Sequence, residues 1–119
     1  MGLKILIPYT TLLECRLDTT VLVVDNQDIR RIGDIVKHYH KGGWGFLTEN
    51  LPKHQETDWW ERVRSIADDF RWGFYETPSL PTVKPYEGTL EFYGGVGNHR
   101  AMAVAIRGGQ EPIPVILNL

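Results

Sequence analysis

Three glycines within four residues separate a strand-like run from an alanine-rich segment in the last third of the chain. Thr89–Tyr93 has the composition of a compact strand, Gly94–Gly97 follows it, and Arg100–Arg107 has the composition of a buried helix. A glycine-rich turn between a strand and a helix lets the backbone pass close to a ligand and points N–H groups at an anion. This pattern favours phosphate binding at Gly94–Arg100.

The side chains at the helix end of this loop have the chemistry of phosphate ligands. Arg100 offers a fork of donors that matches phosphate oxygens, and Asn98 and His99 can each donate or accept a hydrogen bond. The residues that we predict to hold phosphates are Gly95, Gly97, Asn98, His99 and Arg100. A tight turn with positive φ would use the same glycines, and Arg100 would then pair with a carboxylate, so a purely structural role stays open.

The first half of the chain alternates apolar strand-like runs with one segment of helical period. Short runs of aliphatic and β-branched residues predict strands, and apolar residues at three-and-four spacing predict one face of a helix. Acidic and amide residues before that segment favour a helix start, and paired glycines favour its end. The expected elements are strands at Leu3–Tyr9 and Val21–Val24, a helix from Ile29 that Asp25–Asp28 caps and Gly42-Gly43 stops, and a surface loop over residues 45–55.

The second half predicts another helix and three strand segments. Thr57 precedes acidic residues, and apolar residues recur at helical spacing from Trp59 to Phe70, which predicts a helix with Trp59 on its buried face. Gly73 favours the end of this helix. Prolines cannot donate to a strand ladder, so they favour edge positions or strand beginnings. The remaining expected elements are an edge strand at Thr82–Lys84, a hairpin turn at Tyr86–Thr89, a strand at Thr89–Tyr93 and a final strand at Pro112–Leu117.

Length and charge limit the classes of protein that this chain can belong to. At 119 residues it has the usual length of one domain, and we expect a single domain over residues 1–119. A net charge of −2 disfavours nucleic acid as the main partner, because neutralising a phosphate backbone needs clustered Lys and Arg. Cys15 is the only cysteine, which excludes an internal disulfide. No run is apolar enough to span a bilayer, so we expect a cytoplasmic location without a membrane partner.

The order of motifs at the end of the chain resembles that of ParB-like nuclease-domain proteins. The residues that match the family's G-x-[HR]-R, helix, glycine and P-V-I block are Gly97-Asn98-His99-Arg100, Ala101–Ile106, Gly108-Gly109 and Ile113–Ile116. Ile7-Pro8 with Leu12, and then Asp28–Gly43, are similar to the family's opening strand and following helix. Residues 50–80 have no counterpart and look like a helical insertion. The resemblance implies a ParB N-terminal/sulfiredoxin-like α/β (α+β) domain, with a small mixed sheet and flanking helices.

The resemblance also implies a nucleotide-binding function. ParB-like proteins include partition factors that bind CTP with magnesium, free-serine kinases and reported nucleases, and sulfiredoxins share the fold and use ATP. The implied ligand is a nucleoside triphosphate, ATP or CTP with Mg²⁺, and the implied chemistry is NTP hydrolysis or phosphoryl transfer. Glu14 and His99 are the implied catalytic residues, although Glu14 could be a solvated surface residue. Asn98 stands where sulfiredoxins have the cysteine of F-G-G-C-H-R, so sulfiredoxin chemistry is not expected.

Two other functions stay open at this point. The chain could be a non-catalytic interaction module, encoded by a phage or mobile element, that grips a protein partner through the 57–72 helix with Trp59 and an exposed Trp60. It could instead be a nuclease or DNA-associated factor, which the acidic balance disfavours. His38 and His40 near the end of the first helix are explained better by the helix dipole than by a metal or phosphate site.

Overall fold

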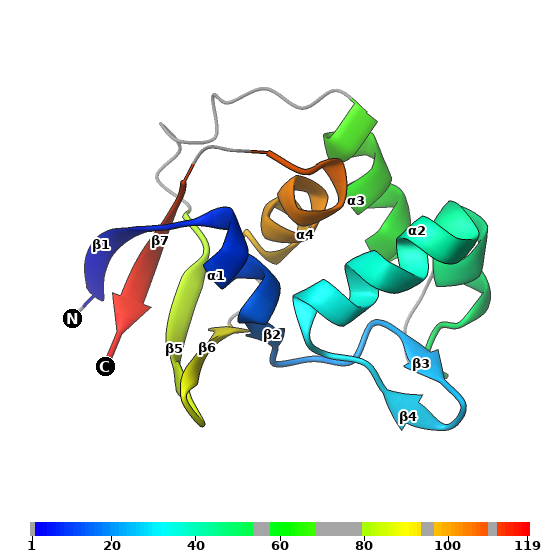
Figure 1. The fold of residues 1–119 in the computed structure, drawn as a ribbon, viewed down its shortest axis with the longest axis horizontal. Helices are drawn as coiled ribbons and strands as arrows, with labels where there is room; N and C mark the ends of the chain where they lie inside the picture. The colour runs from blue at the N-terminus through cyan, green and yellow to red at the C-terminus, as the bar shows by residue number, and fades with distance from the viewer. Residues whose placement is uncertain (1, 54–57, 69–79, 94–96, 110–111) are drawn as a thin grey trace.

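The computed structural model describes residues 2–53, 58–68, 80–93, 97–109 and 112–119, and in these ranges it shows a mixed α+β fold (Figure 1). The described strands are β1 (Gly2–Ile7), β2 (Arg16–Leu17), β3 (Val23–Val24), β4 (Gln27–Asp28), β5 (Thr82–Tyr86), β6 (Thr89–Tyr93) and β7 (Ile113–Asn118). The described helices are α1 (Tyr9–Glu14), α2 (Ile32–Glu49), α3 (Asp58–Asp68) and α4 (Asn98–Arg107). The predicted fold class, α/β (α+β) with a small mixed sheet and flanking helices, is confirmed.

Five strands form one mixed sheet in the order β1-β7-β5-β6-β2, and β3 and β4 form a separate hairpin. The pairs β1–β7 and β5–β6 are antiparallel, whereas β5–β7 and β2–β6 are parallel. Glu87 and Gly88 connect β5 to β6 with φ values of 45° and 83°. Positive φ at both residues of a two-residue turn matches the right-handed twist of the flanking strands. The predicted turn at Tyr86–Thr89 and the predicted strand at Thr89–Tyr93 are therefore confirmed.

Both proline-containing strands lie inside the sheet, which differs from the predicted edge positions. β5 lies between β7 and β6, and β7 lies between β1 and β5. β5 tolerates Pro85 because its ladder with β7 covers only Thr82 and Val83, so the proline lies beyond that ladder. Pro112 precedes β7 and Pro114 is its second residue, which confirms the alternative that prolines mark the beginning of this strand.

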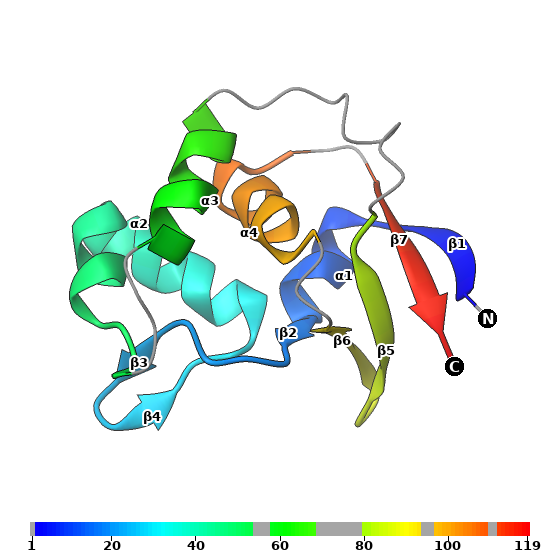
Figure 2. The same cartoon turned by 180° about the vertical axis from the view of Figure 1, so that it is seen from behind.

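Helix α4 lies at the centre of the molecule, with the five-stranded sheet on one side and α2, α3 and the β3–β4 hairpin on the other (Figures 1 and 2). Residues Ala101–Ile106 are all buried, and α4 contacts α1, α2 and α3. Its alanines allow close approach of neighbouring elements and cost little entropy in a helix. The hydroxyl of Tyr9 donates to the carbonyl of Ala105 and ties α1 to α4. The predicted buried helix is confirmed and begins two residues earlier than expected.

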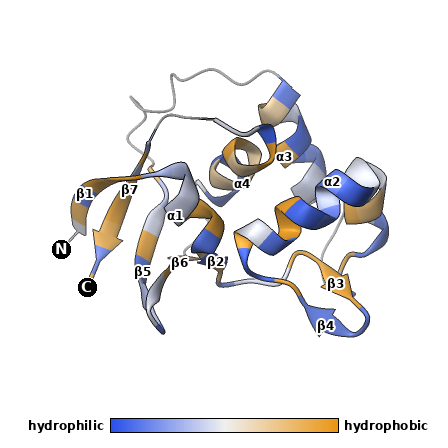
Figure 3. Ribbon diagram, viewed as in Figure 1, coloured by the Kyte–Doolittle hydropathy of each residue, from blue (hydrophilic) through white to orange (hydrophobic). Residues whose placement is uncertain are grey.

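The segment before α2 forms a hairpin turn rather than the predicted helix cap. Asp25 and Asn26 have φ values of 52° and 64° and connect β3 to β4. Asp and Asn tolerate this left-handed conformation better than most residues do. Figure 3 shows the contrast between the hydrophobic β3 and the hydrophilic β4. α2 then begins at Ile32 after Arg31, so the prediction of a helix start at Ile29 was wrong.

Helix α2 also extends beyond its predicted end. The backbone leaves helical geometry at Gly43, where φ is 70° and ψ is −165°, and the chain then continues as helix to Glu49. Leu47 in this second part is fully buried. The predicted surface loop over residues 45–55 was therefore wrong for residues 45–49. None of the helices in the described ranges is long and apolar enough to cross a membrane.

Helix α3 confirms the predicted helix but turns a different face toward the core. Its buried residues are Trp60, Val63 and Ala67. Val63 belongs to the predicted face, whereas Trp60 and Ala67 each follow a predicted residue by one position. Trp59 and Ile66 are only partly buried, and they pack against the core from its border. Phe70 and the predicted helix end at Gly73 lie outside the described residues.

Candidate functional site

Gly97 begins the candidate site because it turns the chain into α4. Its φ of 78° and ψ of −4° lie in the left-handed region, and it is the residue before the first residue of the helix. A Cβ atom at this position would come within 2.7 Å of Pro81 Cγ and 2.8 Å of Pro81 N. Both the backbone conformation and the close approach of Pro81 therefore require glycine here. Gly95, also predicted to bind phosphate, lies outside the described residues.

The amino end of α4 presents backbone hydrogen-bond donors, and no acidic side chain lies in its first turn. The first intrahelical bond runs from the N–H of Ala101 to the carbonyl of Gly97, at 2.9 Å, so the N–H groups before Ala101 have no intrahelical acceptor. The first turn contains no acidic residue to neutralise the positive end of the helix dipole. The structure therefore places the predicted residues Asn98, His99 and Arg100 together in the first turn of α4.

Asn98 is buried at this helix end and leaves one polar atom unsatisfied. Its side chain belongs to a residue that is 2% exposed, and its Oδ1 atom has no hydrogen-bond partner among the described residues. A buried acceptor without a donor costs about 1–3 kcal/mol, so such an atom calls for a water molecule, a ligand or an ion. This oxygen would accept a hydrogen bond or coordinate a cation, whereas a phosphate oxygen would need the neighbouring N–H groups.

The His99 ring lies next to an aromatic residue of α3 in a tilted arrangement. The centroids of the His99 and Trp59 rings are 4.8 Å apart and their planes meet at 35°. Burial, together with the nearby positive charge of Arg62, lowers the pKa of His99 below its ordinary value of 6.5. The imidazole is therefore mainly neutral at pH 7, so that one ring nitrogen donates a hydrogen bond and the other accepts one. Arg62 and the half-buried Arg100 supply the positive charge of this region.

Trp60 does not take the exposed position that a partner-binding role would require. It is fully buried, and its Nε1 donates to the carbonyl of Val21 at 2.9 Å. Its ring meets that of Trp59 edge to face, with centroids 4.8 Å apart. The expectation of an exposed Trp60 was therefore wrong, because α3 turns the face containing Trp60 toward the core.

Glu14, the predicted catalytic carboxylate, lies near the start of β6, whereas the glycine loop follows the end of that strand. The hydroxyl of Thr89, the first residue of β6, donates to the carbonyl of Glu14 at 2.9 Å. The Glu14 side chain lines a separate pocket of about 530 Å³ with Arg16 and Arg31. The structure thus groups Glu14 with arginines rather than with His99. Sequence reasoning missed this pocket because its arginines are scattered among separate elements.

The remaining sequence candidates have structural explanations. His38 stacks on Phe46 with ring centroids 5.4 Å apart, as a packing residue of α2 would. In the part of the chain that the structure describes, no three His, Cys, Asp or Glu side chains form a group that could hold a metal ion. Burial, reinforced by the charge of Glu14, raises the pKa of the Cys15 thiol to about 12. A buried thiol with a raised pKa stays protonated at neutral pH and is a poor nucleophile.

Comparison of this chain with protein-family models, with curated proteins and with solved structures finds no match.

Proposed function

We propose that this chain binds a nucleoside triphosphate, ATP or CTP with Mg²⁺, at the amino end of α4. The observation that carries the proposal is the entry into α4: a left-handed Gly97 packed against Pro81, followed by a helix end without an acidic residue. Such a helix end combines N–H groups that lack intrahelical acceptors with the positive end of a dipole, which suits phosphate. The resemblance of Gly97–Arg100 to the G-x-[HR]-R motif of ParB-like proteins supports the same ligand.

Each part of a nucleotide would meet a different group of this region. The N–H groups of the first turn and the guanidinium of Arg100 would hold phosphate oxygens. The Trp59 and His99 rings, which already lie next to each other, would border the base or the ribose. Arg62 adds positive charge close enough to His99 to lower its pKa. These groups come from two helices, α3 and α4, that pack against each other.

Magnesium would reach this site with the nucleotide rather than through a ready-made protein cage. Mg²⁺ prefers oxygen ligands and keeps several waters, so it needs few protein ligands when phosphates are present. The unsatisfied Oδ1 of Asn98 is an oxygen of the required kind. When bound, the ion would neutralise phosphate charge. His99 remains the predicted acid or base for hydrolysis or transfer, and Glu14 stays a prediction that would require the nucleotide to extend toward the start of β6.

Calorimetric titration tests the proposal. Wild type, Arg100→Ala and Arg64→Ala would each be titrated with ATP, CTP and GTP, with and without magnesium, after circular dichroism has shown that each variant is folded. We expect wild type and Arg64→Ala to bind at least one nucleotide equally well, because Arg64 is exposed on α3 and pairs with Asp68. Arg100→Ala should weaken binding by about tenfold or more, since a hydrogen bond to a charged group is worth about 1.5–3 kcal/mol.

Two results would contradict the proposal. A folded wild type that binds none of the nucleotides would leave the α4 loop a structural turn, and unchanged affinity in Arg100→Ala would place the nucleotide elsewhere. The interaction-module alternative would then have to use the outer, charged face of α3, because Trp60 is buried. The nuclease alternative predicts salt-sensitive binding of DNA, which the same titration with an oligonucleotide would measure.

A further inference from the structure

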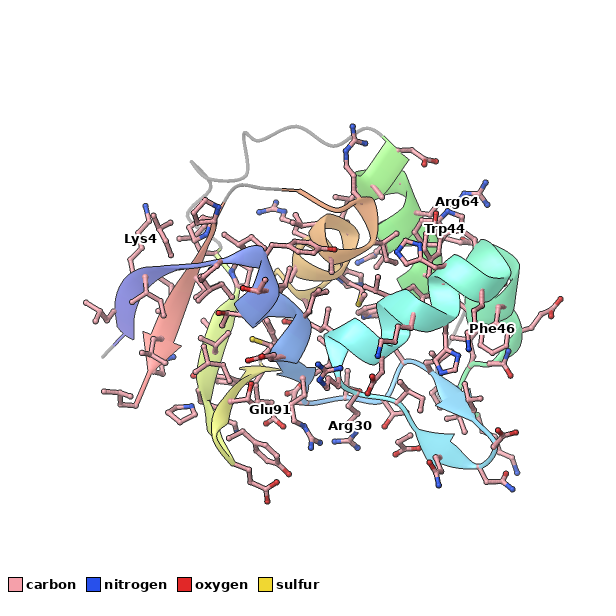
Figure 4. The ribbon with its side chains drawn as sticks, in the orientation of Figure 1. Lys4, Arg30, Trp44, Phe46, Arg64 and Glu91 are labelled. Carbon is pink, nitrogen blue, oxygen red and sulfur yellow. The ribbon has the colours of Figure 1, made fainter. Side chains whose placement is uncertain are left out.

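The pocket around Glu14 lies apart from the α4 site and has its own chemistry. Its volume is about 530 Å³, and it opens where the end of α1, the start of α2 and the β5–β6 turn meet. Arg16 and Arg31 contribute cations to it, and Tyr86 contributes an aromatic ring. Figure 4 shows Arg30, which also lines the pocket, and Glu91, which pairs with Arg16, at the same lower edge of the molecule.

Two neighbours, Glu91 and Tyr86, orient the guanidinium of Arg16. Its Nε lies 3.0 Å from Oε2 of the buried Glu91, and its Cζ lies 4.2 Å from the centre of the Tyr86 ring. The Nε–H is buried and is not aligned for a hydrogen bond, so the contact with Glu91 is an ion pair without hydrogen-bond geometry. The terminal amino groups make no hydrogen bond to any residue that the structure describes. A guanidinium fixed on one side and unoccupied on the other is a preorganised fork for an oxyanion.

Arg31 lies directly beside Arg16. The two residues form an antiparallel β-bridge, which puts both side chains on the same face at close spacing. Two like charges in this position repel unless anions lie near them. Arg31 donates to Asp34 at 3.0 Å, and both side chains of this pair are 46% exposed. A ligand oxyanion between the two arginines would relieve the remaining repulsion.

The charges of the lining limit which oxyanion fits. The lining contains three arginines and four carboxylates, which gives it one net negative charge. Arg30 pairs with Asp28 at 3.7 Å, while Glu14 and Glu87 have no ion-pair partner in the described ranges. A phosphate dianion would face this net negative lining. A monocarboxylate carries less charge, and a hydroxyl or ammonium group on the same ligand would find acceptors at Glu14 and Glu87.

We propose that this pocket binds a small monocarboxylate that also carries a hydrogen-bond donor. Its carboxylate lies between the forks of Arg16 and Arg31, and its hydroxyl or ammonium group donates to Glu14. The Tyr86 ring packs against the planar guanidinium of Arg16 and helps to orient its fork for bidentate binding. This site is separate from the proposed nucleotide site, so either of the two can fail without the other.

NMR titration of the ¹⁵N-labelled chain tests the proposal with four probes. Glycerate carries a hydroxyl, alanine carries an ammonium group, acetate carries neither, and inorganic phosphate is the dianion. We expect saturable shifts of the Arg16, Arg31 and Thr89 amides with glycerate or alanine, and affinity several-fold weaker for acetate. The probe that binds more tightly identifies the donor as hydroxyl or ammonium.

Variants place the binding at the two arginines. Arg31→Gln should weaken binding of the tightest-binding probe by about tenfold, because it removes a hydrogen bond between charged groups. The substitution breaks only the exposed ion pair between Arg31 and Asp34, so the variant should still fold. Arg16→Gln should abolish binding. Because this substitution leaves the buried Glu91 with Lys84 as its remaining ion-pair partner in the described ranges, circular dichroism must first show that the variant is folded. Arg64→Gln serves as the matched control and should bind like wild type. No saturable shift with any carboxylate, tighter binding of phosphate, or unchanged affinity in Arg31→Gln would overturn the proposal.

Discussion

At the scale of single residues, the environment of each side chain decides its role more than its type does. The adjacent tryptophans of α3 differ in this way. Trp60 is buried and donates a hydrogen bond to the carbonyl of Val21, whereas Trp59 lies at the border of the core beside His99. Gly97 and Gly88 both have positive φ, but only Gly97 is packed against another part of the backbone. These two glycines offer a direct comparison.

Gly97→Ala should destabilise the protein more than Gly88→Ala does. Alanine at either position adopts an unfavourable left-handed conformation, at about 1 kcal/mol. At Gly97 the new Cβ would also meet the backbone nitrogen of Pro81 at 2.8 Å, whereas a Cβ at Gly88 would find nothing within 4 Å. We therefore expect a loss of about 2–3 kcal/mol for Gly97→Ala. Urea denaturation of both variants measures this, and equal losses would show that Pro81 moves away without cost.

At the scale of elements, tertiary packing explains where sequence patterns succeed and fail. The strand at Thr89–Tyr93, its hairpin turn and the buried α4 follow from local composition, because β-branched runs, glycine and alanine act within a few residues. Helix α2 continues past Gly43 because residues beyond the kink find partners: Leu47 is buried, and Trp44 meets Tyr39 edge to face at 5.0 Å. The residue types around Gly43 do not by themselves predict those contacts.

Some candidate site residues are brought together by local sequence, and others only by tertiary contacts. Local sequence placed Asn98, His99 and Arg100 together, because adjacent residues at a helix start need no long-range information. The pairing of Arg16 with Arg31 depends on a bridge between segments 15 residues apart, which no local pattern encodes. On α3, Trp60 is buried in place of the predicted Trp59 because Trp60 reaches the carbonyl of Val21, on a segment far away in the sequence.

Substitution of two glycines in α2 should change stability in opposite directions. Gly43 has a φ of 70°, so alanine there should cost about 1 kcal/mol. Gly45 lies in the helical part beyond the kink, with nothing within 4 Å of a new Cβ, so Gly45→Ala should stabilise the protein by about 0.5–1 kcal/mol. Thermal unfolding followed by circular dichroism measures both effects. Stabilisation by Gly43→Ala would mean that α2 can straighten without losing the contacts of Trp44.

At the scale of the whole molecule, the elements converge on one buried core around α4. α1, α2 and α3 all contact α4, and Cys15 lies fully buried between α1 and β2. The Cys15 thiol donates to the carbonyl of Thr11 at 3.2 Å, and the burial that surrounds it raises its pKa from 9.0 to about 12. A titratable group in this position makes the stability of the entire fold depend on pH.

Alkaline pH should therefore destabilise the protein through Cys15. The unfolded thiol loses its proton near pH 9 whereas the folded thiol keeps it to about pH 12, so this contribution is complete below pH 9 and is lost as the pH rises toward 12. We expect wild type to lose about 2 kcal/mol more than Cys15→Ala between about pH 8 and about pH 10.5. Burial also raises the pKa of Tyr9, but that group is present in both proteins and cancels. Urea denaturation at each pH gives the difference, and parallel pH profiles would mean that water reaches Cys15 in the folded state.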